Sequence, residues 1–360
     1  MALDLRLAGY RSGGIARYAE ELFQALRPIS GLAVRAVRAP RDPTPDPRAW
    51  RVRTPPHHRL ERYVLGAELL TRRPKPRIFH ATDFIAPRMP GTPVIATVHD
   101  LTLLTNPELL DPAGLAYYRQ IFTSKRWTAA WITPSQWTAD SLVELVGVDP
   151  GSVTVIPHGL PRLDETTAPL PRTERGDYLL AVGTIEPRKR YDLLLDALAQ
   201  LPEAPRTIIV GQPGWRSAET QARLWSNSYV EWRARVSDAE LAQLYGNAWA
   251  VAVPSLAEGF GFAALEAMAH GTPVLSSGHG ALPEVTGSAA LVPPNDDAEG
   301  WAAAISALRA DAALWQQLSA DGYRRALTFT WTQAARATAD IYRTVAGYNA
   351  ARARRPRGTA

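Results

Sequence analysis

The chain of 360 residues runs twice through the same alternation of short β-rich segments and helical patterns, and this alternation restricts its fold more than any other feature. In the first half, the predicted strands cover residues 2–6, 32–37, 77–80, 94–98, 131–133 and 153–156. In the second half, they cover residues 178–182, 207–210, 249–253 and 273–276. Strands that alternate with helices of this length form parallel sheets with helices on both faces. The sequence therefore predicts an α/β protein.

A proline-rich segment at residues 160–175 separates the two series and is the predicted linker. We expect two doubly wound, Rossmann-like domains, an N-terminal one at residues 1–165 and a C-terminal one at residues 172–330. A long amphipathic helix follows at residues 331–348, and a basic tail at residues 349–360 ends the chain. One face of this helix carries Trp331, Ala335, Thr338, Tyr342 and Val345.

Local signals predict where several helices begin and end. Ser135 and Ser237 are predicted N-caps, and Ser237 forms a capping-box pattern with Glu240. Gly271 is the predicted C′ residue of a helix over residues 262–270. Residues 40–56, which are rich in Pro and Arg, are predicted to form a loop.

The sequence contains no cysteine, which excludes disulfides, thiolate metal sites and a cysteine nucleophile. Asp4 and Arg6 interrupt the first apolar run, so this run does not match a signal peptide. No stretch approaches the roughly 18 apolar residues that are needed to span a bilayer. These features predict a cytoplasmic protein, either free or attached to the inner face of a membrane.

Basic residues are concentrated in one part of the N-terminal half. Between Arg27 and Arg77 the chain has 13 Arg or Lys and 4 Asp or Glu, a net charge of +9, whereas the whole chain carries +5. Four more arginines lie between residues 352 and 357. A stripe of this kind attracts phosphates, nucleic acid or an anionic membrane. It is equally typical of a solvated surface, and both interpretations stay open at this point.

Parallel sheets bind ligands beyond the C-terminal ends of their strands, so the segments that follow strands are the candidate site. Gly13 and Gly14 follow the first strand and let the backbone approach a ligand, although a lone Gly-Gly pair is also typical of a tight turn. His99 follows the strand end and precedes Asp100, a position that suits a structural and a catalytic histidine equally.

Gly183 opens a segment that reads Gly-Thr-Ile-Glu-Pro-Arg-Lys, directly after the strand at residues 178–182. Its adjacent Arg188 and Lys189 suit a diphosphate, because Arg binds two oxygens in a fork and Lys supplies a point charge. The alternative is a pair of solvated cations. The position at a strand end favours the diphosphate.

Two glutamates, Glu258 and Glu266, flank the start of a predicted helix. The amides of Phe260, Gly261 and Phe262 would point out of the helix N-terminus, as an anion site requires. The two carboxylates can accept hydrogen bonds from hydroxyl groups, one on a sugar and the other on a ribose. Apolar neighbours predict that Glu266 is buried, where an unpaired carboxylate is unfavourable.

In their order and spacing, these motifs resemble glycosyltransferase family 4, the retaining enzymes of GT-B fold. The resemblance covers nearly the whole chain: the N-terminal glycine loop, the segment at residues 183–189, the two glutamates with seven residues between them, Pro283-Glu284 and the last helix. It implies two Rossmann-like domains that face each other across a cleft, a hinge in residues 160–175, and a last helix that crosses back to the acceptor-side N-domain.

The resemblance also implies roles for the candidate residues. Glu258 would hold hydroxyls of the donor sugar, and Glu266 would hold those of the ribose. Arg188 and Lys189 would bind the diphosphate and stabilise it as it leaves, and His99 would contact a sugar hydroxyl. The residues that would bind the donor are Gly13, Gly14, Gly183, Phe260, Gly261, Phe262 and Glu266.

Three residues depart from the family pattern. Thr184 stands where many relatives have Arg, so the positive charge depends on the two cations that follow it. His158 precedes Gly159 where Asn-Gly is commoner, and Arg235 lies near the strand expected to contact the base. The identity of the base therefore stays open at this point.

By resemblance, the donor is a nucleotide sugar, with GDP-mannose favoured over a UDP-hexose, and no other cofactor is implied. The chain has no Asp-x-Asp motif, so a catalytic metal is not predicted. The acceptor would be a glycan or a lipid-linked molecule, as in polysaccharide biosynthesis. The basic stripe lies in the acceptor-side domain and could contact an anionic membrane surface.

Two other classes of function remain. A sugar-nucleotide epimerase or hydrolase on a similar fold would release an epimer or free sugar without an acceptor. A basic nucleic-acid-binding protein is the other, but the stripe lacks interleaved aromatic residues and no recognition helix is apparent, so no nucleic-acid partner is predicted. A dinucleotide-dependent dehydrogenase is disfavoured, since no Gly-x-Gly-x-x-Gly follows the first strand.

Overall fold

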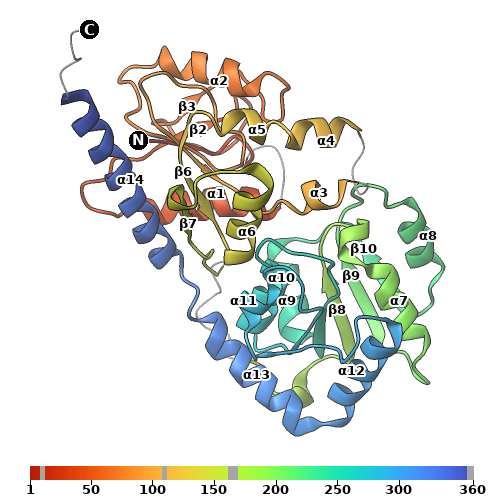
Figure 1. Cartoon of the computed structure of the whole chain (residues 1–360). Helices are drawn as coiled ribbons and strands as arrows, with labels where there is room; N and C mark the ends of the chain where they lie inside the picture. The colour runs from red at the N-terminus through yellow and green to blue at the C-terminus, as the bar shows by residue number, and fades with distance from the viewer. Residues whose placement is uncertain (9–12, 108–111, 161–168, 355–360) are drawn as a thin grey trace. The chain divides into compact units, whose positions relative to one another are not determined.

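The computed structural model describes residues 1–8, 13–107, 112–160 and 169–354 of the chain (Figure 1). It divides into two compact units. The first comprises residues 1–105, 112–159 and 330–360, and the second comprises residues 106–111 and 160–329. The predicted boundary at residue 165 falls within residues 161–168, which lie outside the described residues.

The first unit is built on a parallel sheet of seven strands with the order β3-β2-β1-β4-β5-β6-β7. The strands are β1 (Ala2–Asp4), β2 (Arg35–Arg38), β3 (Trp50–Arg51), β4 (Phe79–Ala81), β5 (Val94–Thr97), β6 (Thr128–Thr133) and β7 (Val153–Val155). The strand order reverses between β1 and β4, and the loops that follow these two strands separate there. This point is where a doubly wound sheet binds its ligand.

Helices cover both faces of this sheet. They are α1 (Gly14–Leu26), α2 (Glu61–Leu70), α3 (Thr102–Thr105), α4 (Pro112–Tyr118), α5 (Ile121–Ser124), α6 (Gln136–Ser141) and α14 (Trp331–Arg354). Leu65 and Leu69 of α2 pack with Phe79 of β4 in the core of one face. On the other face, Tyr18 of α1 shares a hydrogen bond with Thr97 of β5 at 2.8 Å.

The last helix, α14, belongs to the first unit although it ends the chain. It packs against α1, and its Tyr342 hydroxyl is hydrogen-bonded to Nδ1 of His80 at 2.6 Å. The five residues of the predicted apolar face are all buried, with exposed fractions between 0% and 9%. The predicted helix is therefore confirmed, and so is its return to the N-terminal half of the chain.

The second unit contains a parallel sheet of six strands with the order β10-β9-β8-β11-β12-β13. The strands are β8 (Tyr178–Val182), β9 (Arg206–Val210), β10 (Val230–Arg233), β11 (Ala250–Val253), β12 (Val274–Ser276) and β13 (Ala290–Leu291). The order reverses between β8 and β11. The segments that carry the predicted cations and the predicted glutamates follow these two strands.

Alternate residues of β8 enter different cores, as a doubly wound sheet requires. Leu179 and Ala181 pack with α7, α12 and α13, whereas Tyr178 and Leu180 pack with α9, α10 and α11. The helices of this unit are α7 (Tyr191–Ala199), α8 (Ala218–Ser226), α9 (Asp238–Asn247), α10 (Phe262–Ala269), α11 (Leu282–Thr286), α12 (Ala298–Ala310) and α13 (Ala312–Ala326).

The predicted helix ends are largely confirmed. Ser135 and Ser237 accept hydrogen bonds from the backbone amides of Thr138 and Glu240, as N-caps do. The return half of the capping box is not present, because the Glu240 carboxylate pairs with Arg233 at 2.8 Å instead. Gly271 follows α10 with φ 63°, the left-handed conformation of a C′ residue.

The sequence patterns missed three short strands. β3 lies inside the predicted loop at residues 40–56, where Trp50 is buried beneath the guanidinium of Arg35, 5.0 Å from the ring centre. β10 and β13 contain only four and two residues. β10 reads Val-Glu-Trp-Arg and β13 has only two residues, so neither contains an apolar run of the kind that predicted the other strands.

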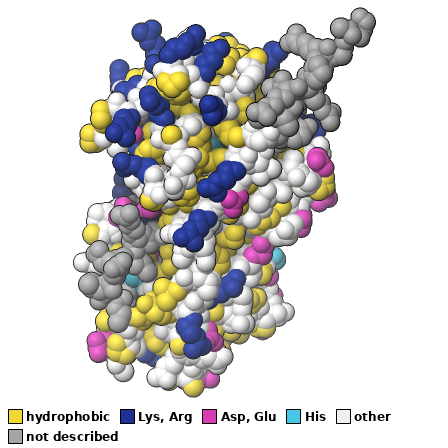
Figure 2. All heavy atoms as spheres, turned by 90° about the vertical axis from the view of Figure 1, so that its left-hand side faces the viewer, with side chains coloured by type: hydrophobic (Ala, Val, Ile, Leu, Met, Phe, Trp, Pro, Cys, Tyr) yellow, Lys and Arg dark blue, Asp and Glu magenta, His cyan; other side chains and the backbone are white. Residues whose placement is uncertain are grey.

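Basic side chains gather on the surface of the first unit, at the top of Figure 2. The predicted stripe is nevertheless not uniformly exposed. Arg38 is 1% exposed and forms ion pairs with Glu20 and Asp42, both at 2.9 Å. Some arginines of the stripe therefore stabilise the fold and are not available to a partner.

Candidate donor site

In the segment after β8, Gly183 leaves space for the side chain of Lys189. Gly183 has φ 151°, and a Cβ there would lie 2.9 Å from Cε of Lys189. Residues Pro187–Lys189 form one turn of 3-10 helix, and Arg190 follows in the left-handed conformation with φ 52°. The Tyr191 hydroxyl donates a hydrogen bond to the Gly183 carbonyl at 3.0 Å and fixes the loop.

Both cations contact Glu258, which follows β11. Lys189 Nζ lies 2.5 Å from one carboxylate oxygen, and Arg188 Nη1 lies 3.0 Å from the other. The Ser255 hydroxyl donates a third hydrogen bond to Glu258 at 2.7 Å. Arg188 also pairs with Glu186 at 2.8 Å and donates a hydrogen bond to the Ala257 carbonyl at 3.0 Å.

The charge state of Glu258 follows from these contacts. Burial alone would raise the pKa of Glu258, which is 8% exposed. Lys189 and Arg188 outweigh this effect, and the hydrogen bonds from Lys189 and Ser255 add to theirs, so the pKa falls to about 2. Glu258 is therefore ionised across the physiological range, and the cluster of two cations, Glu186 and Glu258 is electrically balanced.

The start of α10 lies directly beyond Glu258. Gly261 caps the helix with φ 103° and ψ 52°, and a Cβ there would lie 2.8 Å from Leu282. Phe260 and Phe262 are within 5.3 Å of each other between ring centres, with Phe260 buried in the core. Only glycine fits the conformation that turns the chain from β11 into this helix.

A glycine that sequence reasoning did not single out supports the same segment. Gly280 has φ 63°, and a Cβ there would lie 2.6 Å from both the amide nitrogen and the carbonyl oxygen of Glu258. The backbone of Ala281 donates a hydrogen bond to that carbonyl at 2.8 Å. A positive-φ glycine gives no periodic signal, so only the folded contacts identify its role.

Glu266 is buried on α10, with 7% of its surface exposed, as its apolar neighbours predict. It lies four residues after Phe262, the first residue of α10, and thus about one turn into the helix. The assignment of Glu266 to a ribose stays a prediction.

In the first unit, His99 lies at the end of β5 with both ring nitrogens engaged. Nε2 lies 2.9 Å from the Thr82 carbonyl and Nδ1 lies 3.2 Å from Nε2 of His158. Since a carbonyl only accepts, Nε2 of neutral His99 carries the proton, and His158 donates to Nδ1. Burial lowers the pKa of His99 to about 4, so both rings are neutral at pH 7.

The structure gives His99 an internal structural role, which is one of the two alternatives that its position in the sequence left open. His99 also contacts the ring of Tyr18 edge-on at 4.7 Å between ring centres. A hydrogen bond from His99 to a sugar hydroxyl would require one of its present partners to be replaced. The Thr82 carbonyl fixes the His99 tautomer, and His158, which departs from the family pattern, donates a hydrogen bond to the unprotonated Nδ1 of His99.

The predicted glycine loop of the first unit is described only in part. Gly13 precedes α1 with extended backbone, and apart from its chain neighbours no atom of the described residues lies within 4 Å of the position that its Cβ would take. Gly14 is the first residue of α1, whose first turn contains no acid. Ser12 lies outside the described residues.

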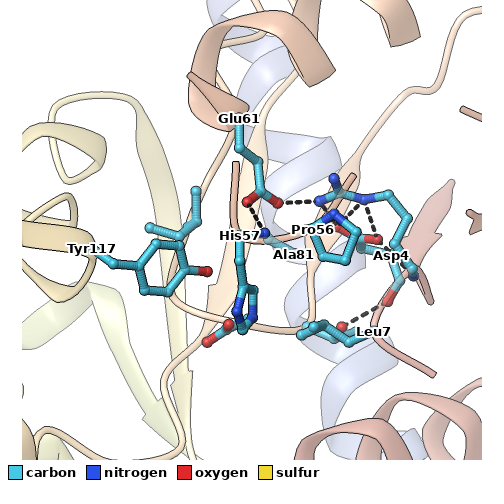
Figure 3. A pocket seen from close by; sticks show the side chains of 11 residues that line it. Asp4, Leu7, Pro56, His57, Glu61, Ala81 and Tyr117 are labelled. Atoms are coloured by element: carbon cyan, nitrogen blue, oxygen red, sulfur yellow. Dashed lines mark hydrogen bonds and ion pairs between the residues drawn. The ribbon is translucent and has the colours of Figure 1, made fainter. Parts of the chain in front are cut away.

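Sequence reasoning missed a buried charged cluster at the point where the strand order of the first unit reverses (Figure 3). Arg6 forms ion pairs with Asp4 at 2.7 Å and with Glu61, which comes from α2. Asp83 follows β4 beside this cluster. Burial raises the pKa of Asp83 to about 7, and Glu61, Asp4 and Asp100 add to the increase. Asp4 and Arg6 had suggested only the absence of a signal peptide.

The described residues show neither a metal-binding cluster nor a helix that could span a membrane. They contain no group of three or more His, Cys, Asp or Glu side chains with a geometry that could hold a metal ion. Among the helices formed by these residues, none has the length and apolar character needed to cross a membrane.

Comparison with family models identifies both halves of the chain. The model described as Glycosyltransferase Family 4 matches residues 12–162. The model described as Glycosyl transferases group 1 matches residues 176–311. The second match includes both strand-end segments that form the Arg188–Lys189–Glu258 cluster.

Curated relatives carry glycosyltransferase names. A D-inositol 3-phosphate glycosyltransferase from Kineococcus radiotolerans is 34% identical over 234 residues, which cover 56% of this chain and 54% of the relative. The O-antigen chain mannosyltransferase B of Escherichia coli is 28% identical over 287 residues, which cover 75% of this chain and 74% of the relative. The chain thus spans about half the length of the first relative and about three quarters of the second.

Solved structures share the fold at low sequence identity. Sucrose-phosphate synthase from Thermosynechococcus elongatus has a TM-score of 0.75 at 22% identity, over 96% of this chain and 98% of that one. HepE from Anabaena, solved in complex with UDP-glucose, has a TM-score of 0.73 at 17% identity, over 95% and 99% of the two chains. With a family model on each half and this fold throughout, the chain belongs to the glycosyltransferases of family 4 and GT-B fold.

Proposed function

We propose that the protein transfers a hexose, with retention of configuration, from a nucleotide diphosphate sugar to a glycan or a lipid-linked acceptor. The observation that carries this proposal is the contact of Arg188 and Lys189 with Glu258 where the strand order of the second unit reverses. Doubly wound sheets bind phosphorylated ligands at such points. Two cations and the start of α10 at one place suit a diphosphate.

The transfer reaction requires that the charge on the leaving diphosphate is stabilised and that the reacting groups are correctly positioned. The bond between the sugar C1 and the diphosphate oxygen breaks, and negative charge develops on the leaving diphosphate. Arg188 and Lys189 would stabilise that charge, and preorganised cations of this kind are effective where water is excluded. The acceptor oxygen then bonds to C1 on the same face, and its proton passes to the departing diphosphate.

Glu258 would hold hydroxyls of the sugar and keep the two cations in place. Its pKa of about 2 makes it an acceptor of hydrogen bonds at every physiological pH. It would not act as a nucleophile in this scheme, so mass spectrometry of trapped reactions should find no glycosyl adduct on Glu258. An adduct there would replace same-face attack by a double displacement.

For the donor, we favour GDP-mannose over a UDP-hexose. Support comes from the Gly-Thr-x-Glu-Pro-Arg-Lys segment and from the mannosyltransferase name of the Escherichia coli relative. The Anabaena structure contains UDP-glucose, so a UDP-hexose is the alternative donor. Transfer independent of a divalent metal is part of the proposal, since the two cations supply the positive charge that a metal would otherwise provide.

A thermal-shift screen with GDP, UDP, ADP and their sugar conjugates tests the proposal without knowledge of the acceptor. We expect GDP and GDP-mannose to raise the melting temperature in the presence of EDTA. A shift with UDP compounds alone would change the donor and keep the enzyme class. If none of these compounds shifts the melting temperature, the glycosyltransferase proposal is contradicted.

We further propose that the protein works in the cytoplasm and contacts the inner face of a membrane through the basic surface of the first unit. An anionic leaflet attracts each arginine near it by about 1 kcal/mol, and several together hold a protein at the surface. Sedimentation with vesicles of phosphatidylcholine, with and without phosphatidylglycerol, measures this contact. Binding that does not depend on the anionic lipid would contradict it.

A further inference from the structure

A second pocket in the first unit differs from the charged cluster of Figure 3, because the lining residues that the structure describes are all basic or neutral. It has a volume of about 490 Å³ and lies between the start of α2 and the α4–α5 segment. Its lining residues are His57, Arg59, Arg62, Ala116, Tyr117, Arg119, Gln120 and Thr123. A concave site whose described lining residues include three arginines and no carboxylate concentrates anions.

The three arginines differ in how they are held. Arg62 is half-buried, donates a hydrogen bond to the Gln120 side chain at 2.5 Å, and is thereby fixed in the wall. Arg59 and Arg119 are exposed, and neither forms an ion pair with any residue that the structure describes. Their guanidinium groups are available to an incoming anion, and Arg binds phosphate in a two-pronged geometry.

Large apolar side chains are exposed beside these arginines. Leu60, directly before α2, is 44% exposed, Tyr63 and Val64 on α2 are 40% and 44% exposed, and Phe122 on α5 is 39% exposed. Tyr63 lies beneath the Arg62 guanidinium, 4.8 Å from its ring centre, and Phe122 is one helical turn beyond Arg119. We call these four residues the apolar rim. Exposed apolar residues next to a basic pocket suit a ligand that is both anionic and apolar.

The pocket also adjoins the end of the sheet where an acceptor would be expected. His57 and Tyr117 line both this pocket and the pocket of Figure 3, which reaches Asp83 at the end of β4. His57 has φ 64°, a conformation that a non-glycine residue adopts only when its surroundings enforce it. A single elongated ligand could therefore contact both pockets across the shared wall.

We propose that the basic pocket binds the phosphate or diphosphate of a lipid-linked acceptor, and that the acceptor's hydrocarbon chain lies on the apolar rim. Arg59, Arg62 and Arg119 would hold the phosphate, and the adjoining pocket would receive the group that accepts the sugar. This inference rests on the proposed glycosyltransferase function, since it narrows the acceptor from a glycan or lipid-linked molecule to an amphiphilic phosphate.

Titration calorimetry with two water-soluble probes tests the inference: farnesyl diphosphate and inorganic pyrophosphate. The full chain is first saturated with the nucleoside diphosphate that it binds, so that the donor site is filled. We expect farnesyl diphosphate to bind at least about tenfold more tightly than pyrophosphate, because only the former contacts the rim. Equal binding of the two diphosphates would overturn the lipid assignment and leave a free-phosphate site.

Two double variants and a matched control locate the binding. R59Q/R119Q should weaken the binding of farnesyl diphosphate by about tenfold or more, since each arginine contributes a charge-assisted hydrogen bond. L60S/V64S should weaken the binding of farnesyl diphosphate and leave the affinity for pyrophosphate unchanged. The control R41Q/R48Q removes the same charge from exposed arginines of the same unit that do not line the pocket. Equal losses in R41Q/R48Q and R59Q/R119Q would overturn the pocket and indicate a general charge effect.

Nucleotide binding separates this inference from the proposed function. If R59Q/R119Q and the wild type bind the nucleoside diphosphate equally but neither binds farnesyl diphosphate, the acceptor inference fails and the transferase proposal stands. If no nucleotide binds the wild type, the proposed function fails first.

Discussion

At the scale of single residues, the charge on Glu258 is the feature on which the site depends. Its carboxylate is buried, yet it stays ionised because Lys189, Arg188 and Ser255 surround it. The same contacts occupy the cations that a diphosphate would need. Glu258 therefore positions Arg188 and Lys189 and also competes with the diphosphate for them.

Replacement of Glu258 by Gln should affect nucleotide binding and sugar transfer in opposite directions. Gln keeps the shape and removes the negative charge, so a free nucleoside diphosphate should bind about three- to tenfold more tightly. Transfer from the nucleotide sugar should fall by on the order of a hundredfold, since sugar hydroxyls lose a charged acceptor. Calorimetry and a coupled assay of nucleoside diphosphate release measure the two effects. Weaker nucleoside diphosphate binding in E258Q would contradict this account of Glu258.

Buried histidines make the first unit sensitive to acid. Burial lowers the pKa of His80 to about 3 and that of His99 to about 4, whereas an unfolded histidine titrates near 6.5. Between these values the unfolded chain binds more protons, so the free energy of unfolding should fall as pH decreases from about 6.5 to 4. Urea unfolding at several pH values measures the slope. H80Q should have a smaller slope, and an unchanged slope would remove His80 from the explanation.

At the scale of elements, two glycines that look alike in the sequence have different surroundings. Gly183 follows β8 and lies against Lys189, whereas Gly13 precedes α1 with open space around it. Both were predicted to bind the donor by resemblance to the family. The folded contacts now distinguish a glycine that the loop requires from one that it does not.

G183A should therefore be more harmful than G13A. A Cβ at residue 183 would lie 2.9 Å from Lys189 in a conformation that favours glycine, and we expect a loss of about 1–3 kcal/mol in the free energy of unfolding. Nucleoside diphosphate affinity should fall with it, because Lys189 is displaced. G13A should change the stability by no more than about 0.5 kcal/mol. Denaturant unfolding of the two variants checks the order, and the reverse order would contradict it.

The sequence predicted the parallel sheets and the last helix from local pattern, but it did not predict the contact of the two cations with Glu258, which joins segments about 70 residues apart. Strand-end position was enough to select Arg188, Lys189 and Glu258. Gly280, His158 and the cluster around Arg6 were not selected, since their roles depend on contacts between segments distant in the chain. β3 was also missed, because it has only two residues and lies in a segment rich in proline.

At the scale of the whole molecule, each unit has its own sheet and its own cores. In the second unit, Arg175 links the C-terminal ends of α9 and α10. Its guanidinium donates hydrogen bonds to the carbonyls of Gly246, His270 and Gly271 at 2.9–3.1 Å and to the Thr272 hydroxyl at 2.6 Å. Burial lowers its pKa to about 10, so it remains charged at neutral pH.

R175M should destabilise the second unit and spare the first. Loss of the buried guanidinium leaves several carbonyls without a donor, which should cost about 3 kcal/mol or more. Hydrogen exchange should show faster exchange in α9 and α10 and unchanged protection in β4 and β5. R206M is the matched control, because Arg206 forms an exposed ion pair with Glu231 and its loss should cost about 1 kcal/mol or less. Equal effects of the two variants would contradict the role of Arg175.

The most direct test of the central claim measures what Lys189 binds. Wild type and K189A are titrated with the nucleoside diphosphate that binds most tightly and with the corresponding nucleoside, which lacks phosphate. We predict that K189A weakens the binding of the nucleoside diphosphate by about tenfold or more, because a charge-assisted hydrogen bond is lost. The affinity for the nucleoside should be unchanged. Equal affinity of the two proteins for the diphosphate would contradict the assignment of this cluster to the donor's diphosphate.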